Sequence, residues 1–406
     1  MKQSHFVFPK KTVKDLELHN KRVLLRADFN VPLNEAGKID SDFRMTATLP
    51  TIEYLLKRQA EVVIVVHLGR PEGRTVPSLS LEPIAQHLGD LLKREVGFID
   101  DCIGDKVKAG LGSVRPARVT VLENLRFHAG EEANDPQFAK ALISAVEPDY
   151  VIQDGFGVVH RAHASTEGIS HLKPAVAGLL LEKEVVALEG AMVHPQKPLV
   201  AVLGGAKIAD KLPLIERFLK EADIILVGGA IANTFLKFMG HHIGKSVYDA
   251  EGEPEVNRIL NLAKPGQLVL PKDIAVSHVV DEHAKRTDCR IDHMHTNEYI
   301  LDIGLASAEL FCQHVEQAGT VIWNGTLGYA ENARFAKGSA RLAQALSQNF
   351  PSLQSIIGGG DTADFVLDWQ KHNKKAQFSH ISTGGGASLE LLSGKSLPGV
   401  EALLEK

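Results

Sequence analysis

Short segments made only of apolar residues recur along the chain, and the longer stretches between them place apolar residues at a helical spacing. Strands that are buried on both faces carry apolar side chains at consecutive positions, and helices between them are typical of parallel strands. The pattern therefore predicts an α/β protein with parallel sheets. The expected strands lie at 23–25, 62–66, 119–122, 151–152, 199–203, 224–227, 268–270, 321–323 and 356–357.

A charged, helix-forming stretch at 181–189, followed by a proline-punctuated segment at 193–198, is the best candidate for a domain boundary. Eleven arginines lie at or before Arg161 and six at or after Arg217, whereas the longest glycine clusters follow the boundary. We therefore expect two lobes that bind different ligands. The predicted domains are 1–180, a joining helix and hinge at 181–198, and 199–388.

The length of the chain agrees with two domains, and its charge and composition argue against some classes of binding partner. A length of 406 residues exceeds what one hydrophobic core usually supports, and a net charge of −5 argues against nucleic acid as the main partner. No apolar stretch has the length of a membrane span, and residues 1–9 lack the core of a signal peptide, so we expect a cytoplasmic protein without membrane association. Cys102, Cys289 and Cys312 are widely spaced and are expected to be reduced and structural.

The most informative segment is 356–364, where an apolar strand breaks into three glycines and then an aspartate. Glycine lets the backbone approach an anion closely, and the free N–H groups at a helix start bind phosphate. Asp361 beside them is placed to hold a metal ion, so the segment predicts a nucleoside triphosphate with magnesium. The alternative is an ordinary strand-to-helix turn, for which one glycine usually suffices.

A second glycine turn follows the strand at 199–203 and precedes Lys207 and Lys211. A spacing of four predicts that both lysines share one face of a helix beginning there, where they would contact phosphate; solvated lysines are the alternative. The spacing of a P-loop is absent. Three further segments complete the expected site: 227–230 for an adenine ring, 323–331 for ribose and phosphate, and 383–388 as a second glycine-rich helix start.

In the first lobe, polar residues follow the predicted strands. In one interpretation, Asp28 and Asn30 lie on one side of an extended chain and hydrogen-bond to hydroxyl groups of the substrate. In the other, they close an Asx turn at the end of the strand. Taken alone, the sequence supports the two interpretations equally. Arg44, taken alone, would be a surface arginine. Arginine or histidine follows three more strands, as His67 with Arg70, Arg126 with His128, and His160 with Arg161 and His163. Together they predict a site for a phosphorylated substrate that bears a carboxylate.

Eight segments, taken in order, resemble the phosphoglycerate kinase family over nearly the full chain. They are RVLLRADFNVP at 22–32, HLGRP at 67–71, ENLRFH at 123–128, HRAHAS at 160–165, GGAKIADK at 204–211, WNGTLG at 323–328, GGGDTAD at 358–364 and STGGGASLELL at 382–392. The resemblance implies two Rossmann-like lobes, each a parallel sheet flanked by helices, joined by a helix and hinge. It also implies that the segment 389–406 returns to the first lobe and that the protein is a monomer.

The implied reaction is reversible phosphoryl transfer between 1,3-bisphosphoglycerate and ADP, giving 3-phosphoglycerate and Mg-ATP. The resemblance assigns the glycerate substrate to Asp28, Asn30, Arg44, His67, Arg70, Arg126, His160 and Arg161. It assigns the nucleotide to Gly205, Lys207, Lys211, Gly229, Asn324, Glu331, Gly359, Gly360, Asp361 and Thr362, with Asp361 as the magnesium ligand. The residues expected to stabilise the migrating phosphoryl group are Arg44 and Lys207 and the amides near Gly360 and Gly386.

This chemistry needs no general base, because the attacking oxygen is already ionised; alignment and charge neutralisation suffice. Water would hydrolyse the acyl phosphate, so we expect in-line transfer after the lobes close on both substrates. The chain departs from the family pattern at Gln153, Gly155, Val158, Val159, Leu305, Thr326 and Ala330. None of these changes removes a charged or metal-binding group, so they bear on loop rigidity and on the placement of Glu331.

Two alternatives remain: a nucleotide-sensing or scaffold protein that keeps the fold, and a kinase for another carboxylate. The presence together of Arg44, Lys207, Lys211 and Asp361 argues against the first alternative. The intact basic set of the first lobe argues against the second.

Overall fold

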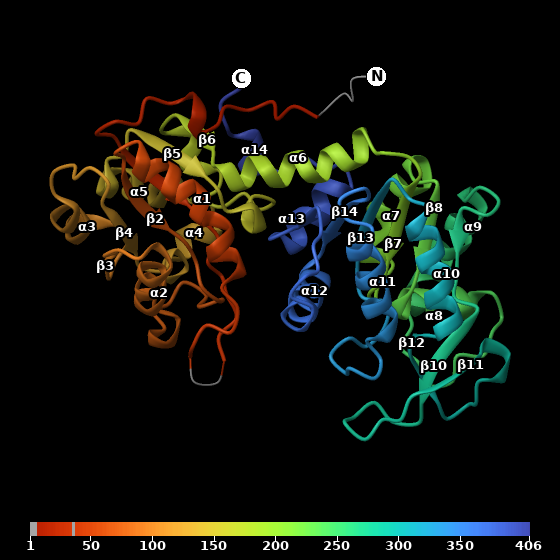
Figure 1. Ribbon diagram of the computed structural model, residues 1–406. Coiled ribbons are helices and arrows are strands. Elements are labelled where there is room, and N and C mark those ends of the chain that lie inside the picture. Colours follow the sequence, from red (N-terminus) through yellow and green to blue (C-terminus); the bar gives the residue numbers. More distant parts are fainter. Residues whose placement is uncertain (1–5, 35–36) are drawn as a thin grey trace. The chain divides into compact units, whose positions relative to one another are not determined.

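The computed structural model describes residues 6–34 and 37–406 of the chain (Figure 1). Packing divides it into an N-terminal unit, Val7–Val186 with Ser396–Lys406, and a C-terminal unit, Ala187–Lys395 with Phe6. The division falls inside helix α6 (Leu179–Val193), which contains the predicted joining helix. The predicted domain boundaries stay a proposal, and the expected lack of a signal peptide rests partly on residues 1–5, which lie outside the described residues.

The N-terminal unit is built on a six-stranded parallel sheet in the order β3-β4-β2-β1-β5-β6. The three central strands contain runs of Val, Leu and Ile and are buried at every position, as strands covered on both faces require. The strands are β1 (Arg22–Arg26), β2 (Glu61–Val65), β3 (Gly97–Ile99), β4 (Val119–Leu122), β5 (Tyr150–Gln153) and β6 (Ala175–Ala177).

Amphipathic helices flank this sheet. In α5, for example, Asp135 accepts a hydrogen bond from the Gln137 N–H at the helix start, Pro136 occupies the first turn, and Phe138 and Leu142 are buried. The helices wholly within the unit are α1 (Phe43–Lys57), α2 (Glu82–Leu92), α3 (Gly104–Leu111), α4 (Ala129–Glu132), α5 (Pro136–Val146) and α14 (Pro398–Glu401).

The last residues of the chain complete the N-terminal unit. The Leu404 N–H donates to the Ala175 carbonyl at 2.9 Å, and the Leu404 carbonyl accepts from the Lys11 N–H at 2.8 Å. The Gly399 N–H donates to the Val159 carbonyl at 2.9 Å. The returning segment was expected to begin at residue 389; in the structure α13 (Gly385–Leu392) belongs to the C-terminal unit, and the residues from Ser396 onward belong to the N-terminal unit.

The C-terminal unit contains a second six-stranded parallel sheet, in the order β15-β14-β13-β7-β8-β9. Its strands are β7 (Leu199–Leu203), β8 (Ile224–Val227), β9 (Leu268–Val269), β13 (Thr320–Asn324), β14 (Gln354–Gly358) and β15 (His380–Ile381). Its remaining helices are α7 (Leu212–Glu221), α8 (Gly229–Phe238), α9 (Glu253–Leu262), α10 (Leu305–Glu316), α11 (Lys337–Gln348) and α12 (Gly360–His372). Two parallel sheets flanked by helices confirm the predicted fold class.

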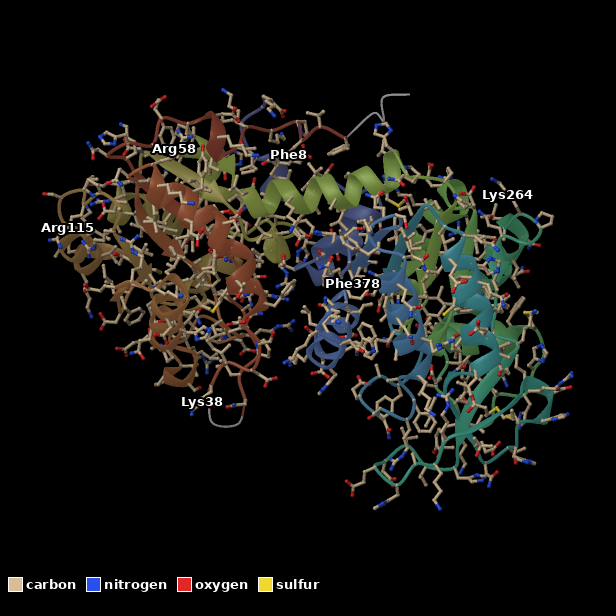
Figure 2. The ribbon with its side chains drawn as sticks, in the orientation of Figure 1. Phe8, Lys38, Arg58, Arg115, Lys264 and Phe378 are labelled. Carbon is tan, nitrogen blue, oxygen red and sulfur yellow. The ribbon has the colours of Figure 1, made fainter. Side chains whose placement is uncertain are left out.

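The C-terminal unit also holds a small antiparallel sheet that the apolar pattern did not predict. Its strands are β10 (Asp273–Ser277), β11 (Thr287–Arg290) and β12 (Tyr299–Ile303), in the order β11-β10-β12. The outer strand β11 consists largely of exposed polar residues, so no apolar run marks it. The exposed cations Arg115 and Lys264 lie at the outside of their units (Figure 2). The strands of the parallel sheets hold buried apolar side chains.

Asp154 fixes the start of α6 from inside the N-terminal unit. Its Oδ1 atom accepts hydrogen bonds from the N–H groups of Leu180 at 2.9 Å and Leu181 at 3.1 Å. A methyl group on Gly178 would lie 2.0 Å from the same oxygen, so only glycine leaves room for this contact. Burial raises the pKa of the Asp154 carboxyl from 3.8 to about 7, and the charge of Glu184 adds to the effect.

We therefore expect the contribution of Asp154 to the free energy of unfolding to fall as the pH rises from about 4 to about 7. Over this range the unfolded chain has lost the Asp154 proton and the folded chain has kept it, which costs about 1.4 kcal/mol per pH unit. Asp154→Asn keeps an oxygen acceptor but cannot ionise. Denaturant unfolding at several pH values should show the variant gaining stability over the wild-type chain as the pH rises. A stability difference that does not change with pH would contradict a protonated Asp154.

Candidate active site

The N-terminal unit gathers the predicted substrate residues at one edge of its sheet. We call this set the basic surface; it comprises Asp28, Asn30, Arg44, His67, Arg70, Arg126, His160 and Arg161. All except Arg44 follow the carboxyl ends of β1, β2, β4 and β5, which meet at one edge because these strands are parallel. Arg44 comes from the first turn of α1, beside the end of β1. The structure thus brings the predicted residues of this lobe to one side of the sheet.

Hydrogen bonds join several members of the basic surface. The Arg44 guanidinium contacts Asp28 Oδ2 at 2.8 Å, and the Asn30 N–H donates to Asp28 Oδ1 at 3.1 Å. Asp28 therefore forms the Asx turn that was one of the two interpretations, and it orients Arg44 as well. Asn30 Oδ1 accepts from the Gly69 N–H at 2.9 Å, and the Gly69 carbonyl accepts from Arg126 at 2.8 Å. The loops after β1, β2 and β4 are thereby held together.

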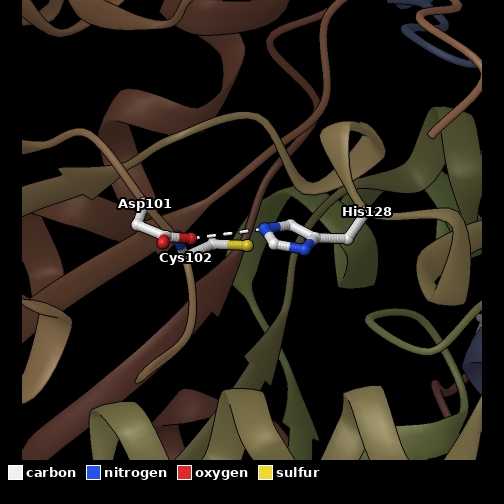
Figure 3. A group of neighbouring side chains, drawn as sticks. All are labelled: Asp101, Cys102 and His128. Carbon is white, nitrogen blue, oxygen red and sulfur yellow. Dashed lines mark hydrogen bonds and ion pairs between the residues drawn. The ribbon is translucent and has the colours of Figure 1, made fainter. Parts of the chain in front are cut away.

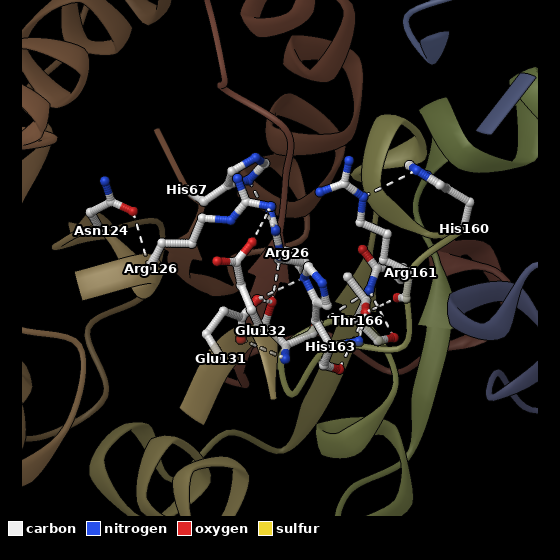
Figure 4. Close-up of polar contacts among 12 residues, drawn as sticks. Arg26, His67, Asn124, Arg126, Glu131, Glu132, His160, Arg161, His163 and Thr166 are labelled. Atoms are coloured by element: carbon white, nitrogen blue, oxygen red, sulfur yellow. Dashed lines mark hydrogen bonds and ion pairs between the residues drawn. The ribbon is translucent and has the colours of Figure 1, made fainter. Parts of the chain in front are cut away.

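His67 lies beside the side chains of Arg26 and Arg126 (Figure 4). Burial lowers the pKa of its imidazole well below the usual 6.5, and the charges of Arg26, Arg126, Arg44 and Arg161 lower it further. The ring is therefore neutral at physiological pH. Its Nδ1 atom lies 3.2 Å from an Arg26 nitrogen, which can only donate, so Nδ1 is the acceptor and Nε2 carries the proton. A neutral donor surrounded by guanidinium groups suits an anionic ligand.

Below the basic surface lies a buried network that sequence reasoning missed (Figure 4). Arg26 is 1% exposed, and its Nε donates to Ser165 Oγ at 2.8 Å. The Ser165 hydroxyl in turn donates to Glu131, which is fully buried, at 2.6 Å. Outside this network the exposed Glu132 pairs with the buried Arg126 at 2.9 Å. The signal in the sequence was a charged residue, Arg26, at the end of an apolar strand.

The remaining members of the basic surface are more open to solvent. Arg70 is exposed, and Arg161 is half-buried with its Nε 3.2 Å from His160 Nε2. His163, in the same segment, is buried. Burial, with the charges of Arg126 and Arg26, lowers the pKa of the His163 imidazole to about 4, so this ring is also neutral. His163 therefore adds no positive charge to the surface.

In the C-terminal unit, Lys211 lies between the ends of two neighbouring strands. Its Nζ donates to the carbonyls of Gly204 after β7, at 2.7 Å, and of Asn324 at the end of β13, at 2.9 Å. Burial lowers the pKa of this ammonium group to about 8, against the raising effect of Asp361 and Asp210. Lys207 is exposed and non-helical. The prediction that both lysines share a helix face is wrong, because a 3₁₀ turn (Ala209–Lys211) precedes α7 and Lys211 is only the cap of that helix.

The two glycine-rich helix starts lie next to each other. Helix α12 begins at Gly360 and α13 at Gly385, and a methyl group on Gly385 would lie 3.4 Å from the Gly360 nitrogen. The amide groups near Gly360 and Gly386 are therefore neighbours, as expected for two helix starts that bracket one anion. The Thr362 hydroxyl accepts from the Gly325 N–H at 2.7 Å, which ties α12 to the end of β13. Asp361 is exposed in the first turn of α12.

Asn324 carries an unused donor at this site. It is 3% exposed, and its Nδ2 atom has no hydrogen-bond partner among the described residues. An unpaired buried amide costs free energy unless a ligand satisfies it. The donor lies near Gly359, since a methyl group there would be 3.2 Å from Nδ2. An anion at the start of α12 would thus meet the Asn324 amide.

A cavity of about 360 Å³ opens beside these groups. Predicted nucleotide residues line it, namely Gly205, Gly229, Glu331 and Asp361. Its apolar wall includes Ala232, Leu236, Val247, Ile274 and Leu327. An apolar wall with a few polar groups at one end is typical of a site for a flat ring attached to a polar chain.

The departures from the family pattern have local roles. Gln153 is buried, and its Nε2 donates to the carbonyls of Ser165 at 3.4 Å and Thr166 at 3.2 Å, so it supports the segment after His163. Val158 and Val159 are buried. The Thr326 hydroxyl donates to the Gly328 carbonyl at 3.1 Å, whereas Leu305 is an exposed first residue of α10. Nothing in the structure explains Ala330.

Among the described residues no helix combines the length and the apolar character that a membrane span needs.

A family model described as phosphoglycerate kinase matches residues 13–395. Phosphoglycerate kinase from Moorella thermoacetica is 45% identical over 399 residues, which cover 98% of this chain and 100% of that protein. The corresponding protein of Dictyoglomus turgidum is 43% identical over 402 residues, again covering 98% and 100%.

Solved structures agree with these relatives. The structure of phosphoglycerate kinase from Coxiella burnetii has a TM-score of 0.84 at 40% identity and covers 97% of this chain and 98% of that chain. The crystal structure of phosphoglycerate kinase from Pyrococcus horikoshii has a TM-score of 0.85 at 32% identity, with the same coverage. The chain therefore belongs to the phosphoglycerate kinase family.

Proposed function

We propose that the basic surface binds the glycerate substrate of the phosphoglycerate kinase reaction and that the glycine-rich edge of the C-terminal unit binds the nucleotide. The reaction transfers a phosphoryl group reversibly between 1,3-bisphosphoglycerate and ADP, giving 3-phosphoglycerate and ATP. The observation that carries the first assignment is the neutral His67 surrounded by four guanidinium groups. Such a cluster is costly without an anion, and 3-phosphoglycerate brings a phosphate and a carboxylate.

The nucleotide assignment rests on the unused Asn324 amide, the Lys211 ammonium group and the two adjacent helix starts. We infer that the cavity beside them takes the adenine ring and that Glu331 at its mouth contacts the ribose. Asp361, an exposed carboxylate at the start of α12, fits a magnesium ligand because Mg²⁺ prefers oxygen donors and keeps several waters. When bound, Mg²⁺ neutralises charge on the nucleotide phosphates.

In the proposed mechanism the protein aligns two anions and neutralises charge on the group that moves between them. The attacking oxygen of a carboxylate or a diphosphate is ionised already, so no side chain needs to remove a proton. Arg44, Lys207 and the amides near Gly360 and Gly386 would stabilise the phosphoryl group during in-line transfer. The cytoplasmic location and the monomeric state of this enzyme are proposed from the family resemblance alone.

The direct test is a coupled assay of the purified protein with 3-phosphoglycerate, ATP and magnesium, followed as NADH oxidation through glyceraldehyde-3-phosphate dehydrogenase. We expect robust turnover that stops when any one of the three components is left out. Nucleotide binding without turnover would instead favour a sensing or scaffold protein. Turnover with another carboxylate but not with 3-phosphoglycerate would reject the proposed substrate.

Replacing Asp361 with asparagine should weaken Mg-ATP binding on the order of tenfold or more, because the loss of a charged contact costs about 1.5–3 kcal/mol. Isothermal titration should show 3-phosphoglycerate binding nearly unchanged. Asp368→Asn, an exposed position on the same helix, is the matched control and should leave both affinities unaltered. Equal weakening of both ligands by Asp361→Asn would indicate a folding defect rather than a lost magnesium ligand.

A further inference from the structure

Two loops at the outer edge of the N-terminal sheet bring a carboxylate, a thiol and an imidazole together. Asp101 and Cys102 follow β3, and His128 follows the short turn after β4. Strands β3 and β4 pair in parallel, so both loops leave the same edge of the sheet. One ligand-type atom from each of the three side chains lies within 4.8 Å of the other two (Figure 3).

His128 ends the segment 123–128, yet its contacts differ from those of Arg126. Its Nε2 atom lies 3.2 Å from Asp101 Oδ1, and its ring packs against Phe138 with ring centres 5.3 Å apart. These contacts direct His128 toward the loop after β3. The proposed phosphoryl transfer uses neither His128 nor Asp101, so their pairing calls for another explanation.

Cys102 is fully buried, and its surroundings argue against a reactive thiol. Burial raises the pKa of the Cys102 thiol well above 9, and the charges of Asp101, Glu131 and Glu123 raise it further. A protonated, enclosed thiol is a poor nucleophile and is not readily oxidised. A metal ion can nevertheless bind this sulfur as a thiolate, because the metal takes the place of the thiol proton.

We propose that Asp101, Cys102 and His128 form a binding site for a zinc-type divalent cation. The donor set of one sulfur, one nitrogen and one oxygen is one that Zn²⁺ accepts and that Mg²⁺ avoids. The Asp101 and His128 side chains are 37% and 33% exposed, which leaves a path from solvent and room for a water as fourth ligand. The proposed site therefore differs in its donor atoms from the magnesium site proposed at Asp361.

The spacing of the donors supports four-coordinate geometry. Zinc bonds of about 2.0–2.3 Å place neighbouring ligands of a tetrahedron about 3.3–3.6 Å apart. The 3.2 Å between Asp101 Oδ1 and His128 Nε2 is only slightly shorter than such an edge. Asp101 Oδ1 also accepts from the Cys102 N–H at 2.7 Å, which holds the carboxylate beside the thiol. Side-chain rotations would bring the third donor into range, and the thiol proton would pass to solvent as the sulfur binds the metal.

Cobalt(II) is the probe for this site, because it replaces zinc and reports its ligands by absorption. Metal-stripped protein titrated with Co²⁺ should develop a near-ultraviolet thiolate-to-cobalt band and the strong visible bands of tetrahedral cobalt. Added Zn²⁺ should abolish both, and excess Mg²⁺ should abolish neither. Cys102→Ser should remove the thiolate band and weaken binding on the order of a hundredfold or more, whereas Cys289→Ser and Cys312→Ser should keep the band.

Two further variants distinguish the loss of a metal ligand from the loss of the folded structure. Asp101→Asn keeps an acceptor for the Cys102 N–H but removes the charge, and His128→Gln removes the nitrogen ligand. Each should weaken cobalt binding at least tenfold while circular dichroism stays unchanged. A thiolate band that survives in Cys102→Ser, or a wild-type protein that binds Co²⁺ without any thiolate band, would overturn the proposal.

Discussion

Replacing Arg44 with alanine should lower kcat by a hundredfold or more and change KM for Mg-ATP little. The expected size is that of one lost donor to the developing charge of the transition state. The Arg44 side chain is 29% exposed and is oriented by Asp28, so it is both available to a ligand and held in place. Steady-state kinetics in the coupled assay, with each substrate varied in turn, measure the effect.

The control for this prediction is Arg58→Ala. Arg58 caps the other end of the same helix, about 21 Å from Arg44 along the helix axis, and lies over the Tyr54 ring at 5.1 Å. Its loss should leave kcat unchanged. Arg44→Lys keeps the charge without the planar guanidinium and should fall between the wild type and Arg44→Ala. A loss confined to KM in Arg44→Ala would reject a role in the transition state.

The second large effect is expected for Gly325→Ala, at the end of β13. Gly325 has a φ of +100°, and a methyl group there would lie 2.3 Å from the Gly204 carbonyl carbon and 2.5 Å from Lys211 Nζ. The substitution forces apart the two strand ends that hold Lys211. We expect a stability loss of several kcal/mol from backbone strain and overpacking together, and a loss of Mg-ATP binding, with 3-phosphoglycerate binding retained.

Gly240→Ala is the matched control in the same unit, because it introduces the backbone strain of a positive φ without the steric overlap expected for Gly325→Ala. Gly240 also has a positive φ, of +87°, but a methyl group would meet nothing within 4 Å. It should cost only about 1–2 kcal/mol, and Mg-ATP affinity should not change. Denaturant unfolding and calorimetric titration of both variants provide the comparison. Equal effects on nucleotide binding would show that crowding at Lys211 is not the cause.

The sequence predicted the central strands of both parallel sheets because buried strands such as β2 and β7 are continuous apolar runs. It did not predict β11, whose exposed residues carry no such signal, or the two-residue edge strand β15, although it did predict β9, which is equally short. The order of strands also stayed out of reach, since neighbours such as β1 and β5 are far apart in the chain. Pairing of this kind depends on tertiary packing, which no local pattern contains.

A residue of the candidate site could be predicted where it directly follows a predicted strand, because its position in the sequence then also gives its position in the sheet. His67 and Arg126 are of this kind, because polar residues at the carboxyl ends of parallel strands must share an edge. The buried partner Glu131 was not found, since a glutamate in a short helix gives no sign that it is enclosed. The helix start was misplaced at Lys207, where the chain makes a bend and a 3₁₀ turn before α7 begins. The roles of these residues stay a proposal until the variants are measured.

The hydrogen bonds of Leu404 with Lys11 and Ala175 determine when, during synthesis, the N-terminal unit can finish folding. Residues near the two ends of the polypeptide lie side by side in the N-terminal unit, and Lys406 donates to the Pro9 carbonyl at 3.0 Å. A ribosome emits the amino end first, so most of that unit leaves the exit tunnel long before its final pieces exist. Until Leu404 has been added and has left the tunnel, the backbone groups of Lys11 and Ala175 lack this partner. The N-terminal unit therefore cannot complete its folding until residues 396–406 have left the ribosome.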